Sequence, residues 1–479
     1  MATTFPNLID GQQLDSTDRT TDVNPSNLKD VVGEFARASS SEVDQAIASA
    51  RTAFKKWSRT TPQERFDVLD RAGSEILARK DELGRLLSRE QGKPLADGIG
   101  EAARAGYIFK FFAGEALRPG GEKIDSTRPG IDVEITREPI GVVATITPWN
   151  FPLAIPAWKI APALACGNCV VFKPAELVPA SPWTLADIIQ RAGLPPGVLN
   201  LVMGPGSKIG PALASSPEID AVSFTGSQDV GPSVAAAAVK NGARVQLEMG
   251  GKNPLIVLDD ADLPTAVSVA VNGAFFQAGQ RCTASSRLIV TEGIHDRFIE
   301  AVIARMKTLV IDDALKPGTE IGPVVDERQL QKNLEYVEIG RKEGARLAEG
   351  GGLLKRETDG YYMAPALFAD TAPEMRINQE EIFGPVASVI RVRDYEAALA
   401  MANATPYGLS AGIVTTSLKH ASHFKRNSES GLVMVNLPTA GLDYHVPFGG
   451  RKKSSYGPRE QGTYAKEFYT IVKTAYVAP

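Results

Sequence analysis

The stretch GVVATITPWNFPLAIPAWKIAPALACGNCVVFKP, residues 141–174, decides the fold class. It begins and ends with short apolar runs rich in β-branched residues, 141–148 and 169–174, and PAWKIAPALA between them is typical of a helix. A buried strand, a helix and a second buried strand form the repeating unit of a parallel sheet covered by helices. We therefore predict an α/β fold.

The same alternation continues along the chain. Apolar runs follow at VLNLVMG (198–204), AVSFTG (221–226) and PLIVLD (254–259), and after residue 285 come SRLIVTE, APALFAD, ASVIRVRD and SAGIVTT. One core rarely exceeds about 300 residues, so a chain of 479 residues is expected to contain at least two α/β units.

Other segments differ from this pattern. Residues 41–117 predict three helices, and the second of them, PQERFDVLDRAGSEILARKDELGRLLSREQG, is expected to end at Gly92. IDVEITREPI (131–140) and FYTIVKTAYV in the C-terminal tail alternate apolar and polar residues like half-exposed strands. Such strands often pair with another chain.

Composition excludes several classes of function. A net charge of −4 with scattered Lys and Arg argues against nucleic acid or an anionic membrane as partner. The polar N-terminus is not typical of a signal peptide, and no apolar stretch reaches the roughly 20 residues needed to span a bilayer. We expect a cytoplasmic protein.

The chain has three cysteines, Cys166, Cys169 and Cys282, which is too few for a disulfide framework. Cys166 and Cys169 form a CxxC without a second pair, and the four histidines lie far from it in sequence. We interpret this pair as two small buried hydrophobic residues rather than a zinc or redox site, and we expect no metal.

Cys282, in FFQAGQRCTASSR, lies outside the apolar runs. A free cysteine is usually a structural thiol, but two features favour reactivity here. The neighbouring Arg281 can lower the pKa of the thiol, and the small residues that follow can begin a helix whose N-terminus favours thiolate.

Two polar residues follow strand-like runs. Glu248, between Leu247 and Met249, is either a surface residue or a partly buried carboxylate whose raised pKa suits a general base. Asn150, in ITPWNFP, either donates to an oxyanion or only satisfies the backbone of a turn.

A glycine-containing turn is the candidate for binding a pyrophosphate. FTGSQDVG (224–231) has the order strand, tight turn and helix N-terminus, with the Ser227 hydroxyl available in the turn. GPGSKIG (204–210) is a pattern of similar strength, although its third glycine comes one residue too late for the usual dinucleotide fingerprint.

Taken together, the motifs resemble those of the aldehyde dehydrogenase superfamily over nearly the whole chain. The matching motifs are TPWNFP (147–152), FKPAELVPAS (172–181), FTGSQDVG (224–231), LEMGGKNP (247–254), GQRCTASSR (279–287), EEIFGPV (380–386) and PFGGRKKSS (447–455). The resemblance implies an NAD(P)-binding Rossmann-like domain at 1–118 and 139–249. It also implies a catalytic domain at 250–457 and an oligomerisation arm at 119–138 and 458–479.

The resemblance also implies roles for catalytic residues. Cys282 would attack the aldehyde, and the Asn150 amide with the backbone N–H of the cysteine would hold the oxyanion. Glu248 would activate the water that hydrolyses the thioester, and Lys159 would lie near the proton-relay route.

The cofactor implied is NAD, with NADP also possible. Lys173 and Glu176 match residues at the adenosine ribose, where the carboxylate would repel a 2′-phosphate. Ser227 matches the pyrophosphate contact, with Trp149 alongside. The full set of implied cofactor residues is Thr147, Trp149, Lys173, Glu176, Gly226, Ser227, Glu381 and Phe383.

Small anionic semialdehydes are the expected substrates. Arg281 would either pair with a substrate carboxylate or act only on the thiol or a neighbouring loop, and Trp158 and Phe276 match positions lining the substrate tunnel. The segment NLPTAGLDYHVPFGGRK (436–452) is similar to that of 2,5-dioxopentanoate dehydrogenases. Succinate semialdehyde is the alternative, followed by a broad or aromatic aldehyde specificity.

Three rival activities have to be considered. A CoA-acylating dehydrogenase has less need of Glu248. A cofactor-free thiol hydrolase would leave the FKPAE and EEIFGPV segments unexplained. A non-catalytic relative would tend to lose Cys282 or Glu248.

One departure from the family is GGRKKSSYGPRE in place of GGxKxSGxGxE. Ser455 there replaces a glycine, and we expect it to affect the contacts of a homodimer or homotetramer more than the chemistry.

Overall fold

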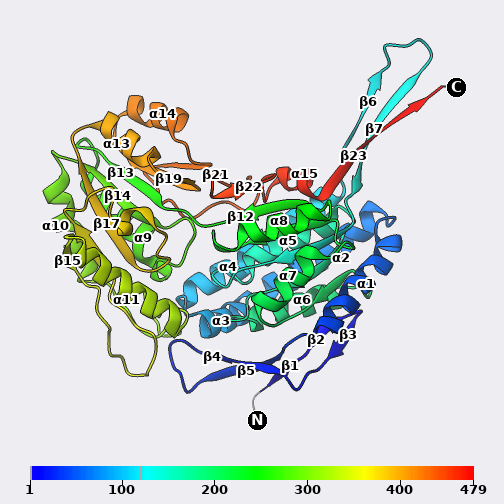
Figure 1. Ribbon diagram of the computed structural model, residues 1–479, viewed down its shortest axis with the longest axis horizontal. Coiled ribbons are helices and arrows are strands. Elements are labelled where there is room, and N and C mark those ends of the chain that lie inside the picture. Colours follow the sequence, from blue (N-terminus) through cyan, green and yellow to red (C-terminus); the bar gives the residue numbers. More distant parts are fainter. Residues whose placement is uncertain (1–2, 119, 479) are drawn as a thin grey trace.

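Two large, mostly parallel sheets flanked by helices form the body of the protein in the computed structural model, which describes residues 3–118 and 120–478 (Figure 1). This confirms the predicted α/β fold. We call the part built on the eight-stranded sheet the first lobe and the part built on the seven-stranded sheet the second lobe.

The first lobe contains the strands that decided the fold class. In spatial order its sheet consists of β22 (Ser455–Tyr456), β12 (Arg244–Glu248), β11 (Ala221–Thr225), β8 (Val142–Ile146), β9 (Cys169–Lys173), β10 (Leu199–Leu201), β2 (Asn7–Ile9) and β3 (Gln12–Leu14). Its helices are α1 (Ser40–Trp57), α2 (Pro62–Ala78), α3 (Lys80–Gln91), α4 (Leu95–Ala116), α5 (Ala154–Ala165), α6 (Ala180–Arg191), α7 (Gly206–Ser215) and α8 (Gly231–Lys240).

The strand order locates the functional edge of this sheet. The five strands from β12 to β10 pair in parallel, and the chain moves from β8 outward through β9 and β10 before returning to β11 on the other side of β8. Ligands of such sheets bind where the order reverses, at the carboxyl ends of the strands. Here that point lies between β8 and β11.

The second lobe repeats the architecture. Its sheet consists of β15 (Arg346–Glu349), β16 (Ala366–Ala369), β17 (Val386–Val392), β14 (Ser285–Thr291), β13 (Asn253–Val257), β19 (Ser410–Val414) and β20 (Leu432–Val435). Its helices are α9 (Leu263–Phe275), α10 (His295–Met306), α11 (Glu327–Lys342), α12 (Arg376–Gln379), α13 (Tyr395–Asn403) and α14 (Leu418–Asn427). The run PLIVLD therefore starts the second sheet rather than ending the first.

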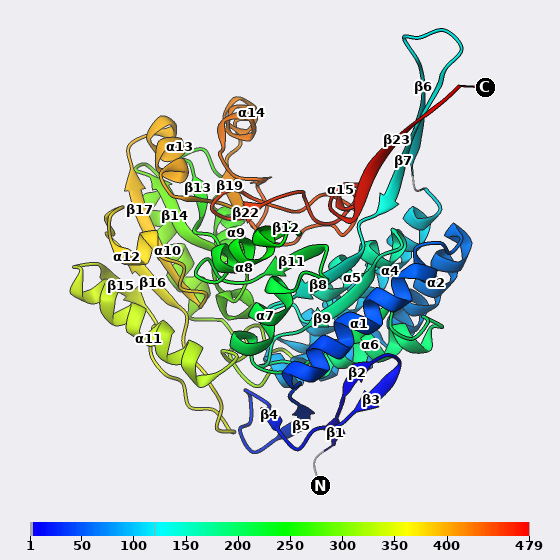
Figure 2. The same cartoon turned by 45° about the vertical axis from the view of Figure 1, so that its right-hand side comes forward.

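A three-stranded arm projects from the body (Figure 2). It is formed by β6 (Gly121–Asp125), β7 (Asp132–Pro139) and β23 (Thr470–Val477), and α15 (Lys466–Tyr469) leads into it. Both predicted half-exposed strands are thus confirmed, and they pair with each other along their length. Pro119, the first residue of the predicted arm, lies outside the described residues.

Some local expectations were wrong. The helix predicted from Pro62 to Gln91 is two helices, because the chain turns at Arg79, which has the non-helical dihedrals φ −104° and ψ 14°. Gly92 ends the second of them with φ 89°, as expected. The polar N-terminus also forms strands, of which β1 (Thr4–Phe5), β5 (Val31–Ala36) and β4 (Arg19–Val23) make a small sheet.

Short elements complete the chain: η1 (Phe276–Gly279), η2 (Thr463–Ala465), β18 (Tyr407–Gly408) and β21 (Arg451–Lys452). Across residues 3–118 and 120–478, no helix combines the length and the apolar character that a bilayer crossing requires.

Candidate active site

Cys282 lies in a short loop between η1 and β14, where the second lobe faces the first. Gln277, Ala278 and Gly279, in η1 before this loop, all have positive φ, at 55°, 53° and 64°. A side chain at Gly279 would overlap the backbone of Gly384 in the EEIFGPV motif, so this glycine is needed for close approach. Strained backbone of this kind is concentrated at functional sites.

Two asparagines hold the cysteine loop. The Asn253 side chain donates to the carbonyls of Cys282 and Ala284 at 2.7 and 2.9 Å. Asn150, buried after β8, donates from its amide to the carbonyl of Gln280 at 3.1 Å. An amide donor from the first lobe is therefore held against the cysteine loop of the second.

The environment of the Cys282 thiol corrects two expectations. Burial, followed by the charges of Glu381 and Glu248, raises the pKa of Cys282 to about 12, whereas its own backbone N–H and that of Thr283 lower it. No helix follows Cys282, because SSRLIVT forms strand β14.

Arg281 is not among the main causes that set the pKa of this thiol, although the Cys282 thiolate favours the charged form of the Arg281 guanidinium. Its Nη2 donates to the carbonyls of Asn272 and Gly273 in the last turn of α9, and this contact caps the helix. Its Nε is buried without a hydrogen-bond partner among the described residues.

Glu248 ends β12 and is buried, with 2% of its surface exposed. Ser455, its neighbour across the sheet on β22, donates a hydrogen bond to Oε2 at 2.5 Å. Burial and the nearby Glu460 raise the pKa of Glu248 well above its ordinary value, and the Ser455 hydrogen bond lowers it. Ser455 therefore contacts the candidate base, which corrects the expectation that it concerns subunit contacts.

Lys159 is fully buried on α5, one residue after Trp158. Its amine donates to Ser223 at 2.8 Å and forms an ion pair with Glu460. The Glu460 carboxylate in turn faces Glu248 and raises its pKa. Glu460 thus links Lys159 electrostatically to the candidate base, and it was not among the predicted site residues.

The candidate nicotinamide residues lie together. The rings of Trp149 and Phe383 meet edge to face with centroids 5.3 Å apart. Glu381 accepts from the backbone N–H of Gly251 at 3.0 Å, and a side chain at Gly250 would overlap its carboxylate. Burial raises the pKa of Glu381 to about 7.

The candidate adenosine residues lie at the end of β9 and just after it. Lys173 is buried, which lowers its pKa to about 8, and Glu176 accepts from Arg37 at 2.9 Å and from Thr20 at 3.1 Å. Arg37 was not predicted from the sequence, because its partner Glu176 lies 139 residues further along the chain.

The remaining cofactor positions border the point where the strand order reverses. Gly226 and the exposed Ser227 form the turn between β11 and α8. Thr147 follows β8, and its buried hydroxyl has no hydrogen-bond partner among the described residues. Exposed turn groups before the N-terminus of α8 and an unpaired hydroxyl at the end of β8 fit the pyrophosphate of a dinucleotide.

Trp158 is buried on α5 and packs against Phe448 and Arg104. It stacks on Phe448 with centroids 5.5 Å apart, and the Arg104 guanidinium lies 5.6 Å from its ring centre. Phe276 instead packs, half-buried, against the core of the second lobe.

Arg104 is the main residue that sequence analysis missed. Its Nη2 donates to Gln461 at 3.1 Å, and its Nε is buried without a partner among the described residues. Burial lowers the pKa of Arg104, whereas Glu101, Asp443 and, after them, the Cys282 thiolate favour its charged form. One turn earlier on α4, Glu101 accepts from the backbone of Leu153 and Ala154, so this face of α4 points to the segment after Asn150. No motif marks Arg104.

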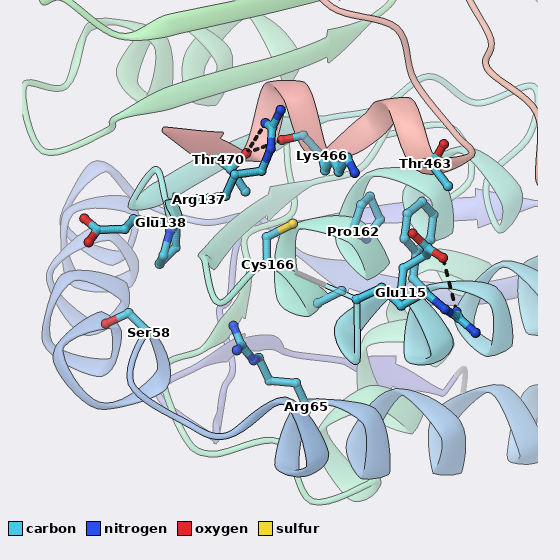
Figure 3. Close-up of a pocket in the computed structure, with 14 residues that line it drawn as sticks. Ser58, Arg65, Glu115, Arg137, Glu138, Pro162, Cys166, Thr463, Lys466 and Thr470 are labelled. Atoms are coloured by element: carbon cyan, nitrogen blue, oxygen red, sulfur yellow. Dashed lines mark hydrogen bonds and ion pairs between the residues drawn. The ribbon is translucent and has the colours of Figure 1, made fainter. Parts of the chain in front are cut away.

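The CxxC cysteines differ in their surroundings. Cys169 is buried in β9, as predicted. Cys166 is only half-buried and borders a cavity, which corrects the prediction for this residue (Figure 3). In the described part of the chain, no group of three or more His, Cys, Asp or Glu side chains is arranged to hold a metal ion.

Comparisons with known proteins match nearly the whole chain. The model of the aldehyde dehydrogenase family matches residues 13–475. The chain is 43% identical to the α-ketoglutaric semialdehyde dehydrogenase of Bacillus subtilis, over 99% of this chain and 98% of that protein.

Solved structures agree as well. An NAD-dependent aldehyde dehydrogenase from Sinorhizobium meliloti has a TM-score of 0.97 and 37% identity, covering 100% of this chain and 95% of that one. The NAD⁺ complex of betaine aldehyde dehydrogenase from Staphylococcus aureus has a TM-score of 0.96 and 34% identity, covering 99% and 95%.

Proposed function

The chain belongs to the aldehyde dehydrogenase family, and from this premise we propose that it oxidises a small, carboxylate-bearing semialdehyde to the acid with NAD. The preferred substrate is 2,5-dioxopentanoate, giving 2-oxoglutarate, and the semialdehyde named for the Bacillus subtilis relative supports this choice. Succinate semialdehyde is the alternative substrate.

One observation carries the proposal: groups from both lobes converge on one thiol. Asn150 reaches the Cys282 loop from the first lobe, and the carboxylates of Glu248 and Glu381 both act electrostatically on the thiol. A nucleophile, an amide donor and a base close together are the requirements for acyl transfer through a covalent intermediate.

In the first half of the reaction, Cys282 attacks the aldehyde carbon after losing its proton. The raised pKa of Glu248 suits a general base at near-neutral pH, and we assign this carboxylate to the hydrolysis that follows rather than to this first step. The Asn150 amide and the backbone N–H of Cys282 stabilise the oxyanion of the thiohemiacetal, and such a donor typically contributes about 3 kcal/mol.

In the second half, Glu248 accepts a proton from the water that attacks the thioester. Glu460 and Lys159 provide a buried route along which that proton can leave. A carboxylate placed in this way favours hydrolysis over transfer to CoA.

NAD supplies the hydride acceptor when bound. The neighbouring NAD-dependent and NAD⁺-bound structures support this cofactor. Trp149, Phe383 and Glu381 would hold the nicotinamide end, and Ser227 the pyrophosphate. Glu176 would bind the adenosine ribose and disfavour a 2′-phosphate, whereas Lys173 and Arg37 leave some use of NADP open.

Arg104 supports a substrate that carries a carboxylate. A partly buried guanidinium with an unpartnered Nε, beside Trp158 and within electrostatic reach of Cys282, suits an anion at the distal end of the aldehyde, although Glu101 and Asp443 also act on it. Arg281 is the second candidate for this contact, although its Nη2 is already bonded to α9.

The cofactor-binding domain would comprise 1–118 and 139–249, the catalytic domain 250–457, and the arm 119–138 and 458–479. We propose that the arm mediates a homodimer or homotetramer, since Val472, Tyr476 and Val477 on β23 are each more than half exposed. The three unpaired cysteines support a cytoplasmic location.

The test is to follow cofactor reduction at 340 nm with 2,5-dioxopentanoate, succinate semialdehyde, a neutral aliphatic aldehyde and an aromatic aldehyde, for wild type and Cys282→Ala. Reduction by wild type alone, fastest with the two anionic semialdehydes, is the expected result. Full activity of Cys282→Ala would reject the mechanism. A preference for the neutral or aromatic aldehyde would reject the substrate class.

A further inference from the structure

A cavity of about 220 Å³ lies where the arm joins the first lobe, and Cys166 faces it (Figure 3). Arg65 on α2 and Cys166 at the end of α5 form one side, while Arg137 on β7 and Lys466 on α15 form the other. None of the residues proposed for the oxidation borders it.

The walls of this cavity carry an excess of positive charge. Four cationic side chains line it, Arg65, Arg118, Arg137 and Lys466, against the two carboxylates Glu115 and Glu138. Glu138 is paired with Lys473 outside the cavity, and Glu115 with Arg118 at 3.3 Å. The positive side chains that line the cavity are therefore not neutralised by the carboxylates that line it.

Two of these cations have no ion-pair partner among the described residues. Arg65 makes no salt bridge there, and its Nε is buried without a hydrogen-bond acceptor. Lys466 likewise has no carboxylate within ion-pair distance. Arg137 is bonded to Glu467 at 2.8 Å and to Thr470 at 3.2 Å.

Cys166 does not neutralise Arg65. Burial raises the pKa of the Cys166 thiol to about 12, so it is uncharged near neutral pH. A buried guanidinium donor without an acceptor is costly, and carboxylate and phosphate oxygens are its preferred partners.

We propose that this cavity binds a small dianion, either phosphate or a short dicarboxylate, between Arg65 on the lobe and Lys466 at the base of the arm. Its volume corresponds to roughly seven water molecules at about 30 Å³ each, which admits such an anion. The bound anion would connect the arm to α2.

Isothermal titration of the full-length protein with phosphate, succinate and acetate at low ionic strength tests this proposal. Wild type is expected to bind phosphate, succinate or both at least tenfold more tightly than Arg65→Gln and Lys466→Gln do. Arg59→Gln, an exposed arginine outside the cavity, is the matched control and should bind like wild type. Comparison with Arg65→Gln also removes any signal from anions in the active site.

Alkylation of Cys166, followed peptide by peptide, is the second measurement, and the buried Cys169 is its internal control. The bound dianion should slow alkylation of Cys166 in wild type but not in Arg65→Gln. Phosphate binding alone would identify phosphate as the ligand, and succinate binding alone a dicarboxylate. Equal affinity for acetate, equal binding by Arg65→Gln, or no binding of any of the three would overturn the proposal.

Discussion

The hydroxyl of Ser455 donates a hydrogen bond of 2.5 Å to Oε2 of Glu248 and accepts one of 2.6 Å from the backbone N–H of Gly450. The serine therefore connects the end of β12 to the loop before β22. It favours the charged carboxylate, whereas Glu460 disfavours it, and the acidity of Glu248 depends on the balance between the two.

Replacing Ser455 by alanine should move the acidic limb of the kcat–pH profile to higher pH. The base must be ionised to act, and loss of a donor to its charged form raises its pKa, by roughly one unit for a charge-assisted hydrogen bond. Ser455→Thr should restore the profile, and Tyr456→Phe, at an exposed neighbouring position, should leave it unchanged. An unaltered limb in Ser455→Ala would mean that the serine does not act on Glu248.

Glu460→Gln should shift the same limb in the opposite direction. In the wild type the negative charge of Glu460 raises the pKa of Glu248, so removing that charge lowers the pKa. Lys159 also loses its ion-pair partner, and its positive charge then acts more strongly on Glu248 and lowers the pKa further. The variant also leaves a buried amine without its carboxylate, so we expect a loss of about 3–5 kcal/mol of stability. Thermal unfolding measures that loss, and a limb moving to higher pH would contradict the assignment.

Glu248→Gln should separate the two halves of the reaction. Acylation can still release one equivalent of NADH per site in a rapid burst, whereas steady-state turnover should fall by about 10²–10⁴-fold for want of a general base. Stopped-flow absorbance at 340 nm resolves both phases. Loss of the burst together with turnover would place Glu248 in the first step as well.

Arg104→Gln should raise KM for the anionic semialdehydes by roughly tenfold to a hundredfold. This range corresponds to the loss of one charge-assisted hydrogen bond, which contributes about 1.5–3 kcal/mol to binding. A neutral aldehyde of the same length should be affected little. Arg281→Gln is the comparison variant, since its guanidinium caps α9. A selective rise in KM in Arg281→Gln alone would assign the anchor to Arg281 instead.

Glu176→Gln should increase the use of NADP relative to NAD by about tenfold or more. It removes the charge that repels a 2′-phosphate and frees Arg37, which Glu176 now holds at 2.9 Å. The ratio of kcat/KM for the two cofactors measures the change. Arg37→Gln should move the ratio toward NAD, and a ratio unchanged in both variants would place the 2′ position elsewhere.

Sequence patterns were sufficient for the parts of the fold that depend on local order. The parallel strands of the first lobe, the arm strands and the position of Glu248 at a strand end all follow from runs of buried or alternating residues. The pattern failed after Cys282, where we expected a helix from small residues although the β-branched run of SSRLIVT forms β14.

The residues that sequence analysis missed depend on contacts between distant segments. Arg104 is an ordinary helical residue until α4 brings it to Trp158 and Gln461. Ser455 stood out only as a departure from the family pattern, and its partner became evident from the pairing of β22 with β12. Contacts between distant segments produce no repeating pattern within either segment, so they cannot be predicted from the local sequence.

The ion pair between Lys159 and Glu460 joins positions 301 residues apart. On the ribosome, Lys159 is therefore made long before the carboxylate that neutralises it, and the first sheet lacks its edge strand β22 until the same late segment arrives. A chain interrupted before residue 455 would bury a charged amine without a counter-charge. The last residues of the chain thus complete both the charge pairing and the sheet edge of the first lobe.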